Sequence, residues 1–149
     1  MPEPLLKVDL TKPAEEQDPP VHNRWHPEIP PVASVNPGDV FRVECKDWTD
    51  GFIQDNDDAS DVRDMPLSRV HILSGPVAVN GAEPGDLLVV DLLDIGVLPD
   101  YQWGYTGIFA RDNGGSFLAD VFPEARKAIW SFDGIYASSR HIGGVRFPG

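Results

Sequence analysis

Three acidic residues that could do acid–base chemistry follow one another closely in the chain: Glu44, Asp47 and Asp50, with Trp48 among them. A carboxylate beside an aromatic surface can have a raised pKa and act as a general acid or base. The same spacing is also typical of polar residues that form a turn at the end of a strand. We take Glu44, Asp47 and Asp50 as candidate catalytic residues and Trp48 as a candidate substrate-binding residue.

A second acidic segment, residues 55–64, is rich in aspartate. Carboxylates packed this closely repel one another, so a chain keeps them together either in open water or around a cation. Counted from Asp55, a calcium-binding EF-hand loop would need glycine at its sixth position and glutamate at its twelfth. The chain has Ser60 and Pro66 there. We therefore favour a mobile acidic loop over a metal site.

The histidines offer weaker candidates. His22 and His26 are four residues apart, but the following Pro27 denies them a helical face, so no zinc pair is predicted. His71 lies among apolar residues and is expected in the core. His141 could pair with a distant acidic residue, and we take it as a second candidate substrate-binding residue.

A turn phrase, Asn-Pro-Gly-Asp at residues 36–39, precedes a segment in which apolar and charged residues alternate, residues 40–47. This alternation predicts a half-buried antiparallel strand. Its buried face would carry Phe41, Val43 and Cys45. A single cysteine also excludes an internal disulfide and any cysteine-based zinc cluster.

The Pro-Gly-Asp phrase returns at residues 83–86 and precedes the apolar residues 87–94. We predict a second, equivalent strand there, more deeply buried because the alternation fades into a continuous apolar run. Asp91 and Asp94 match Glu44 and Asp47 of the first copy. They are weaker catalytic candidates, since their surroundings are predicted to be buried.

The remaining patterns predict a mainly β fold: an antiparallel, jelly-roll-like β-sandwich with one short helix near residues 118–130. The helix is predicted because apolar residues recur there every three or four positions, and its centre is expected at residues 123–130. Residues 1–32 hold eight prolines and are predicted to be an N-terminal arm, with the sandwich domain at 33–149. Further short strands are predicted at residues 70–73, 77–79, 101–110 and within 135–147.

Composition limits the class of protein. Acidic residues outnumber basic ones 24 to 12 among 149 residues, so the formal net charge is −12. This charge argues against nucleic acid and anionic membranes as partners. No apolar run approaches the length of a membrane span, and the first nine residues lack the pattern of a signal peptide. We therefore expect a cytoplasmic protein.

Several longer phrases resemble those of one known family. Residues 22–31 (HNRWHPEIPP) are similar to the opening signature of the acetamidase/formamidase family, and residues 75–86 (GPVAVNGAEPGD) resemble its most recognisable motif. Three more phrases are similar to its formamidase branch: residues 103–110, 113–115 and 138–142. The phrases occur in the family's order, and the resemblance runs from about residue 21 onward.

The resemblance implies a soluble hydrolase that cleaves short aliphatic amides, formamide above all, to a carboxylate and ammonia. It also implies a homo-oligomer and a divalent metal, zinc first, for which Glu44 and Asp47 would be the candidate ligands. Family members are considerably longer. We therefore expect either a piece of a larger enzyme, completed by its remaining half or a second chain, or a short paralogue. The alternative is a non-catalytic β-sandwich module for binding or assembly.

Overall fold

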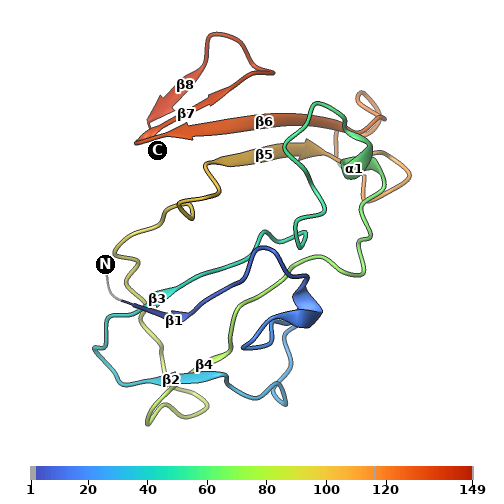
Figure 1. The fold of residues 1–149 in the computed structure, drawn as a ribbon. Helices are drawn as coiled ribbons and strands as arrows, with labels where there is room; N and C mark the ends of the chain where they lie inside the picture. Colours follow the sequence, from blue (N-terminus) through green and yellow to red (C-terminus); the bar gives the residue numbers. More distant parts are fainter. Residues whose placement is uncertain (1–2, 116, 149) are drawn as a thin grey trace. The chain divides into compact units, whose positions relative to one another are not determined.

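The computed structural model describes residues 3–115 and 117–148 (Figure 1). The chain forms two compact units: unit 1 comprises Met1–Gly51 and Ser68–Asp94, and unit 2 comprises Phe52–Leu67 and Ile95–Gly149. The described elements are almost all strands, and the predicted mainly β class with an antiparallel sheet is confirmed. None of the described helices has the length and apolar character needed to cross a membrane.

Unit 1 contains two short pairs of parallel strands. Strand β1 (Pro4–Leu6) pairs with β3 (Arg42–Val43), and β2 (Ala33–Val35) pairs with β4 (Val77–Val79). A 3-10 helix, η1 (Ala14–Glu16), follows β1. Parallel neighbours require a long crossover between them. Unit 1 is therefore held together by segments far apart in the sequence, and the proline-rich first residues supply one of its strands.

The prediction of an antiparallel strand over residues 40–47 is wrong in the length of the strand, in its direction and in which face is buried. Only Arg42–Val43 forms a strand, and it runs parallel to β1. Cys45, predicted in the core, is exposed, whereas Glu44 and Lys46 are buried. The reason is charge pairing: Arg42 lies 2.7 Å from Glu44, and Asp50 lies 2.8 Å from Lys46. These partners offset the cost of burying a charge.

Both Pro-Gly-Asp phrases fold into the same turn. In the first, the Asp39 N–H donates to the Asn36 carbonyl (3.1 Å), and the Asn36 N–H donates to the Asp39 carboxylate (2.8 Å). In the second, the Asp86 N–H donates to the Glu83 carbonyl (3.0 Å), and the Glu83 N–H donates to the Asp86 carboxylate (2.8 Å). The sequence repeat is thus a structural repeat at its turns.

The repeat does not continue beyond the second turn. Residues 87–94, predicted to be a deeply buried strand, form coil (Figure 1), and every one of them is exposed. A strand needs a neighbour to bond its backbone N–H and C=O groups. No described segment pairs with this one. Residues 70–73 are likewise not a strand, apart from an isolated bridge between His22 and Leu73.

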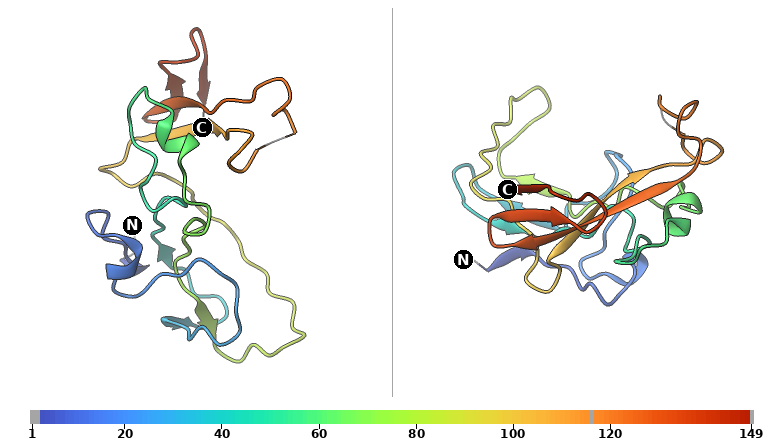
Figure 2. Two further views of the ribbon diagram at one scale, coloured as in Figure 1. Left: turned by 90° about the vertical axis from the view of Figure 1, so that its right-hand side faces the viewer. Right: turned by 90° about the horizontal axis from the view of Figure 1, so that it is seen from above.

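Unit 2 is built on one four-stranded antiparallel sheet, seen from two further sides in Figure 2. Its strands lie in the order β5 (Trp103–Ile108), β6 (Arg126–Asp133), β7 (Tyr136–Ser139) and β8 (Arg146–Pro148). The predictions of strands within residues 101–110 and 135–147 are confirmed.

The prediction of a helix near residues 118–130 is wrong. The second part of that range belongs to strand β6, which spans Arg126–Asp133. Two residues of the predicted apolar stripe, Val121 and Phe122, are exposed, whereas Ile129 is fully buried. The backbone of β6 bonds to β5 on one side and to β7 on the other. These two ladders, with a β-branched Ile129 and an aromatic Trp130, favour the strand over an isolated helix.

The α-helix of the described residues is α1 (Ser60–Arg63), which packs beside β6 in unit 2. Its Val62 is 1% exposed. A Cβ atom placed on Gly107 of β5 would lie 3.4 Å from a Val62 methyl group, so the absence of a side chain at Gly107 lets α1 approach the sheet closely. This contact positions the acidic loop that leads into α1.

Candidate functional site

Glu44 follows β3 and is buried, with 8% of the residue exposed. Its Oε1 accepts a hydrogen bond from Arg42 Nη2 (2.7 Å), and its Oε2 accepts one from the Val8 N–H (3.3 Å). Its own N–H donates to the Leu6 carbonyl (2.9 Å). Glu44 therefore ties the N-terminal residues to β3, and both of its carboxylate oxygens are already bonded.

Asp47 shapes the turn that comes next. Its Oδ2 accepts hydrogen bonds from the Thr49 N–H (3.1 Å), the Thr49 hydroxyl and the Gly51 N–H (3.2 Å). The Asp47 carbonyl accepts from the Asp50 N–H (2.9 Å). This is the pattern of an aspartate that closes a turn on its own side chain. Asp47 thereby sets the position of Asp50.

Asp50 forms a buried ion pair with Lys46. The Lys46 Nζ lies 2.8 Å from Asp50 Oδ1, and the two side chains are 5% and 13% exposed. The Lys46 Nζ also donates to the Lys12 carbonyl, and Asp50 Oδ2 accepts from the Ala14 N–H (2.9 Å). Asp50 has a φ of +58°. Left-handed backbone at a non-glycine residue is uncommon and is found disproportionately at functional sites.

A pocket of about 230 Å³ opens beside Asp50 within unit 1. It is smaller than the roughly 300–1,000 Å³ clefts that hold drug-sized ligands, so it suits a small molecule. Of the predicted site residues, Asp50 alone is among those lining it. The lining residues are Ala14, Glu15, Val21, His22, Asn23, Asp50, Ser68, Arg69 and Ile72.

His22 brings a titratable ring to this pocket. Its Nδ1 lies 2.7 Å from the Arg24 carbonyl oxygen. A carbonyl oxygen can only accept, so Nδ1 carries the proton and Nε2 is the acceptor nitrogen of the neutral ring. The His22 backbone is fixed by two hydrogen bonds to Leu73, of 3.1 and 2.7 Å. The sequence pattern did not indicate this position for His22, because most of the other residues that line the pocket come from other segments of the chain.

Trp48 and His71 stack beside the same turn. Their ring centroids lie 5.2 Å apart, and the His71 N–H donates to the Trp48 carbonyl (2.7 Å). His71, predicted as a core residue, is exposed and has a φ of +67°. The predicted core role is therefore wrong: its backbone caps the turn, and its ring packs on one aromatic neighbour.

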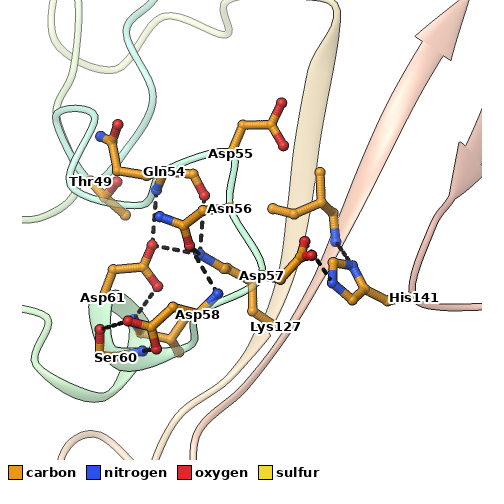
Figure 3. Close-up of polar contacts among 12 residues, drawn as sticks. Thr49, Gln54, Asp55, Asn56, Asp57, Asp58, Ser60, Asp61, Lys127 and His141 are labelled. Atoms are coloured by element: carbon orange, nitrogen blue, oxygen red, sulfur yellow. Dashed lines mark hydrogen bonds and ion pairs between the residues drawn. The ribbon is translucent and has the colours of Figure 1, made fainter.

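A second polar cluster lies in unit 2, where the acidic loop meets β6 (Figure 3). Lys127 projects from β6, and its side chain is 1% exposed. Its Nζ donates to the Gln54 carbonyl (3.0 Å), Asn56 Oδ1 (2.8 Å) and Asp61 Oδ2 (2.6 Å). These three acceptors use the full donor capacity of an ammonium group. The loop predicted to be mobile is therefore bonded to the sheet.

Asp57 joins the same loop to the residues after β7. Arg140 Nε donates to Asp57 Oδ1 (2.7 Å), and Arg140 Nη1 donates to Asp55 Oδ1 (2.7 Å). The hydrogen bond from Arg140 holds the pKa of Asp57 below its usual value and, in turn, raises the pKa of Arg140. In α1, the hydroxyl of Ser60 likewise lowers the pKa of Asp58.

His141 lies between Asp57 and β6 (Figure 3). Its Nδ1 accepts from the Ile129 N–H (3.0 Å), so Nδ1 is unprotonated, and Nε2 carries the proton toward Asp57 Oδ1 (3.2 Å). Both ring nitrogens therefore bond to the protein. The contact with Asp57 is the kind of pairing with a distant acidic residue that was expected for His141.

The predicted site residues are divided between the units. Glu44, Asp47, Trp48 and Asp50 belong to unit 1, and His141 belongs to unit 2. The oxygens of Glu44 and the Oδ2 of Asp47 already accept protein hydrogen bonds, an arrangement that does not fit a pair of metal ligands aimed at one ion. Residues 3–115 and 117–148 contain no cluster of three or more metal-binding side chains.

A formamidase and an acetamidase match this chain closely. It is 59% identical to the formamidase of Methylophilus methylotrophus over 145 residues, which are 97% of this chain and 36% of that protein. It is 56% identical to the acetamidase of Mycolicibacterium smegmatis over 156 aligned positions, covering 100% of this chain and 38% of that one. The chain thus spans little more than a third of the length of these relatives.

Solved structures match it as well. A γ-lactamase from Delftia acidovorans superposes with a TM-score of 0.96 at 57% identity, over 99% of this chain and 36% of that chain. An acetamidase from Bacillus halodurans superposes with a TM-score of 0.67 at 27% identity, over 82% of this chain. The sequence profile of the Acetamidase/Formamidase family matches residues 7–149. The chain belongs to the acetamidase/formamidase family, of which it represents the N-terminal portion.

Proposed function

We propose that this chain contributes the N-terminal part of an amidohydrolase that cleaves short aliphatic amides, formamide above all, to a carboxylate and ammonia. The observation that carries the proposal is its identity of 59% to a formamidase and 56% to an acetamidase across at least 97% of its residues. The polypeptide that completes the reaction would include the family portion that this chain does not span.

The pocket beside Asp50 is the proposed amide site within this chain. Amide hydrolysis needs a group that activates the attacking water or nucleophile, and a proton donor for the leaving nitrogen. Each Asp50 carboxylate oxygen already has one protein partner, Lys46 Nζ or the Ala14 N–H, but each has a second lone pair. Because Asp50 lines the pocket, whereas Glu44 and Asp47 do not, its carboxylate can also accept a hydrogen bond from an amide N–H there. The His22 ring can take up or give a proton at Nε2, because Nδ1 donates to the Arg24 carbonyl. The pocket has room for an amide with a short acyl chain.

Glu44 and Asp47, proposed from the sequence as acid–base groups, have contacts that suit positioning roles. Glu44 fixes the N-terminal residues on β3, and Asp47 fixes the turn that carries Asp50. The substrate-binding roles of Trp48 and His141, the zinc ion and the homo-oligomer stay predictions based on sequence.

The test uses a chimera in which this chain replaces the matched part of the Methylophilus formamidase. We expect the chimera to release ammonia from formamide, and from acetamide more slowly. Ammonia release by the chain alone is the reference, and the difference between the two measures the contribution of the remaining family portion to activity. A folded chimera that releases no ammonia from either amide would contradict the proposed function.

A further inference from the structure

An exposed apolar segment of unit 1, residues 87–93, has no role in the proposed function. Six of its seven residues are large and apolar. Soluble proteins rarely expose a contiguous apolar patch unless it contacts something else. The exposed fractions are 90% for Leu87, 59% for Leu88, 76% for Val89, 65% for Val90, 75% for Leu92 and 73% for Leu93.

The apolar segment has the sequence of a strand buried on both faces. Successive side chains of a strand point to opposite faces, so Leu87 and Val89 would share one face, and Leu88 and Val90 the other. Strands that are apolar on both faces are typical of sheet centres that are covered on both sides. The backbone of the segment bonds to no other described residue. Its side chains and its N–H and C=O groups thus lack the neighbours that such a strand has.

The internal repeat shows what the segment lacks. The first Pro-Gly-Asp turn, at residues 36–39, leads into β3, which pairs with β1. The second turn, at residues 83–86, has the same hydrogen bonds and leads into the apolar segment, which pairs with no described strand. In the second copy, residues 87–93 therefore occupy the position of a strand but have no neighbouring strand among residues 3–115 and 117–148.

The comparisons indicate where the neighbour lies. The backbone of this chain superposes with a TM-score of 0.96 on a γ-lactamase of which it covers only 36%. The γ-lactamase therefore carries this same conformation within a polypeptide nearly three times as long. We propose that residues 87–93 form a sheet strand whose neighbours come from the C-terminal portion of an acetamidase/formamidase polypeptide, which this chain does not span.

A second copy of this chain is a poorer partner for the segment. Each copy carries a formal net charge of −12, so two copies repel one another when they associate. The segment itself is followed by Asp94 and interrupted by Asp91, and it carries no basic residue that could offset this repulsion. The proposal rests on family membership and does not depend on amide hydrolysis.

Hydrogen–deuterium exchange measures the proposed pairing directly. The samples are this chain alone, the chimera with the Methylophilus formamidase, and the natural Methylophilus enzyme at its aligned segment. We expect the amides of residues 87–93 to exchange near the intrinsic rate in the chain alone. In the chimera and in the natural enzyme they should exchange at least ~100-fold more slowly, as ladder-bonded amides do.

Each other outcome overturns the proposal. Fast exchange in the natural enzyme would mean that the segment has no neighbouring strand there. Protection in the chain alone that is independent of concentration would mean that other residues of this chain cover the segment. Protection that grows with concentration would identify a second copy as the partner. If the chimera does not fold, exchange in the natural enzyme still tests the pairing. None of these exchange measurements depends on amidase activity.

A pair of valine variants supplies the matched control in the chimera. Val90 and Val121 are 65% and 69% exposed in this chain. We expect Val90→Lys to abolish the protection of residues 87–93 and to lower the melting temperature of the chimera, and Val121→Lys to leave both unchanged. In the chain alone, Val90→Lys should leave the melting temperature unchanged, because Val90 is already in water. Equal effects of the two variants in the chimera would contradict the pairing.

Discussion

Lys127 Nζ lies 2.6 Å from Oδ2 of Asp61, 66 residues earlier in the chain, and the Lys127 side chain is 1% exposed. The same Asp61 oxygen accepts from the Gln54 N–H (2.9 Å), and Oδ1 accepts from the Val62 N–H (2.8 Å). Asp61 thus links the loop, α1 and β6 through one carboxylate. A buried pair of this kind is costly to break, because the partner left behind is charged and has lost its counterion.

We predict that Lys127→Met lowers the free energy of unfolding by about 3–5 kcal/mol, the usual cost of leaving one partner of a buried ion pair uncompensated. Urea denaturation followed by fluorescence measures this change. Arg126→Met on the same strand is the control, since the Arg126–Glu124 pair is exposed and pairs of that kind contribute little. Equal destabilisation by the two variants would mean that burial of Lys127 does not matter.

The titration of Asp57 provides a second prediction. Arg140 lowers the pKa of Asp57 from its usual value of 3.8, so the contact stabilises the folded protein above that pH. The stabilisation is lost as the pH falls below 3.8 and through the lower folded pKa. We expect Arg140→Gln to raise the Asp57 pKa toward its usual value, measured from the carboxyl carbon shift by NMR. An unchanged midpoint would show that Arg140 does not set this pKa.

Local patterns in the sequence predict the features that depend on local chemistry. The two Pro-Gly-Asp turns formed as predicted, because each closes through hydrogen bonds between residues three positions apart. Strand β5 was also predicted from its own residues. For the candidate site, local spacing grouped Glu44, Asp47 and Asp50, and the structure places all three on one short segment of unit 1.

Features that depend on distant partners were not predictable in this way. Strand β6 resembles a helix in its apolar spacing and becomes a strand because β5 and β7 bond to it on both sides. The acidic loop was predicted to be mobile, yet Lys127 and Arg140 bind it from 66 to 85 residues away. The pocket lined by both His22 and Asp50 likewise depends on contacts between segments that are distant in the sequence. The spacing of residues within one segment does not determine which distant segment that segment will contact.

The repeated turns yield a third prediction, on stability. Gly38 and Gly85 have φ angles of +88° and +106°, and a Cβ atom on either would meet no atom within 4 Å. An alanine side chain at either position would therefore cause no steric clash. Its cost is that of holding an alanine in the left-handed backbone conformation, about 1–2 kcal/mol. We expect Gly38→Ala and Gly85→Ala to lower the free energy of unfolding by that amount in urea denaturation.

Gly96→Ala is the matched control for the turn variants. A Cβ atom at Gly96 also meets no atom within 4 Å, but its φ lies outside the left-handed region. The substitution should leave stability unchanged or raise it slightly, because alanine reduces the entropy of the unfolded chain. If all three variants behave alike, the left-handed conformation of the two turns is not required.

The fourth prediction assigns a role to the Asp50 carboxylate. In the chimera with the Methylophilus formamidase, we expect Asp50→Asn to lower kcat/KM for formamide by roughly 10²-fold or more, the usual size of an acid–base or charge contribution. Asp50→Asn also leaves Lys46 without its counterion, so a loss of activity could reflect a loss of structure. Lys46→Gln separates the two effects, since it breaks the same ion pair and keeps the carboxylate. We expect both variants to lower the melting temperature, and only Asp50→Asn to remove most of the activity at temperatures where both are folded. Equal losses of activity would mean that the pair maintains the pocket and that Asp50 takes no part in the reaction.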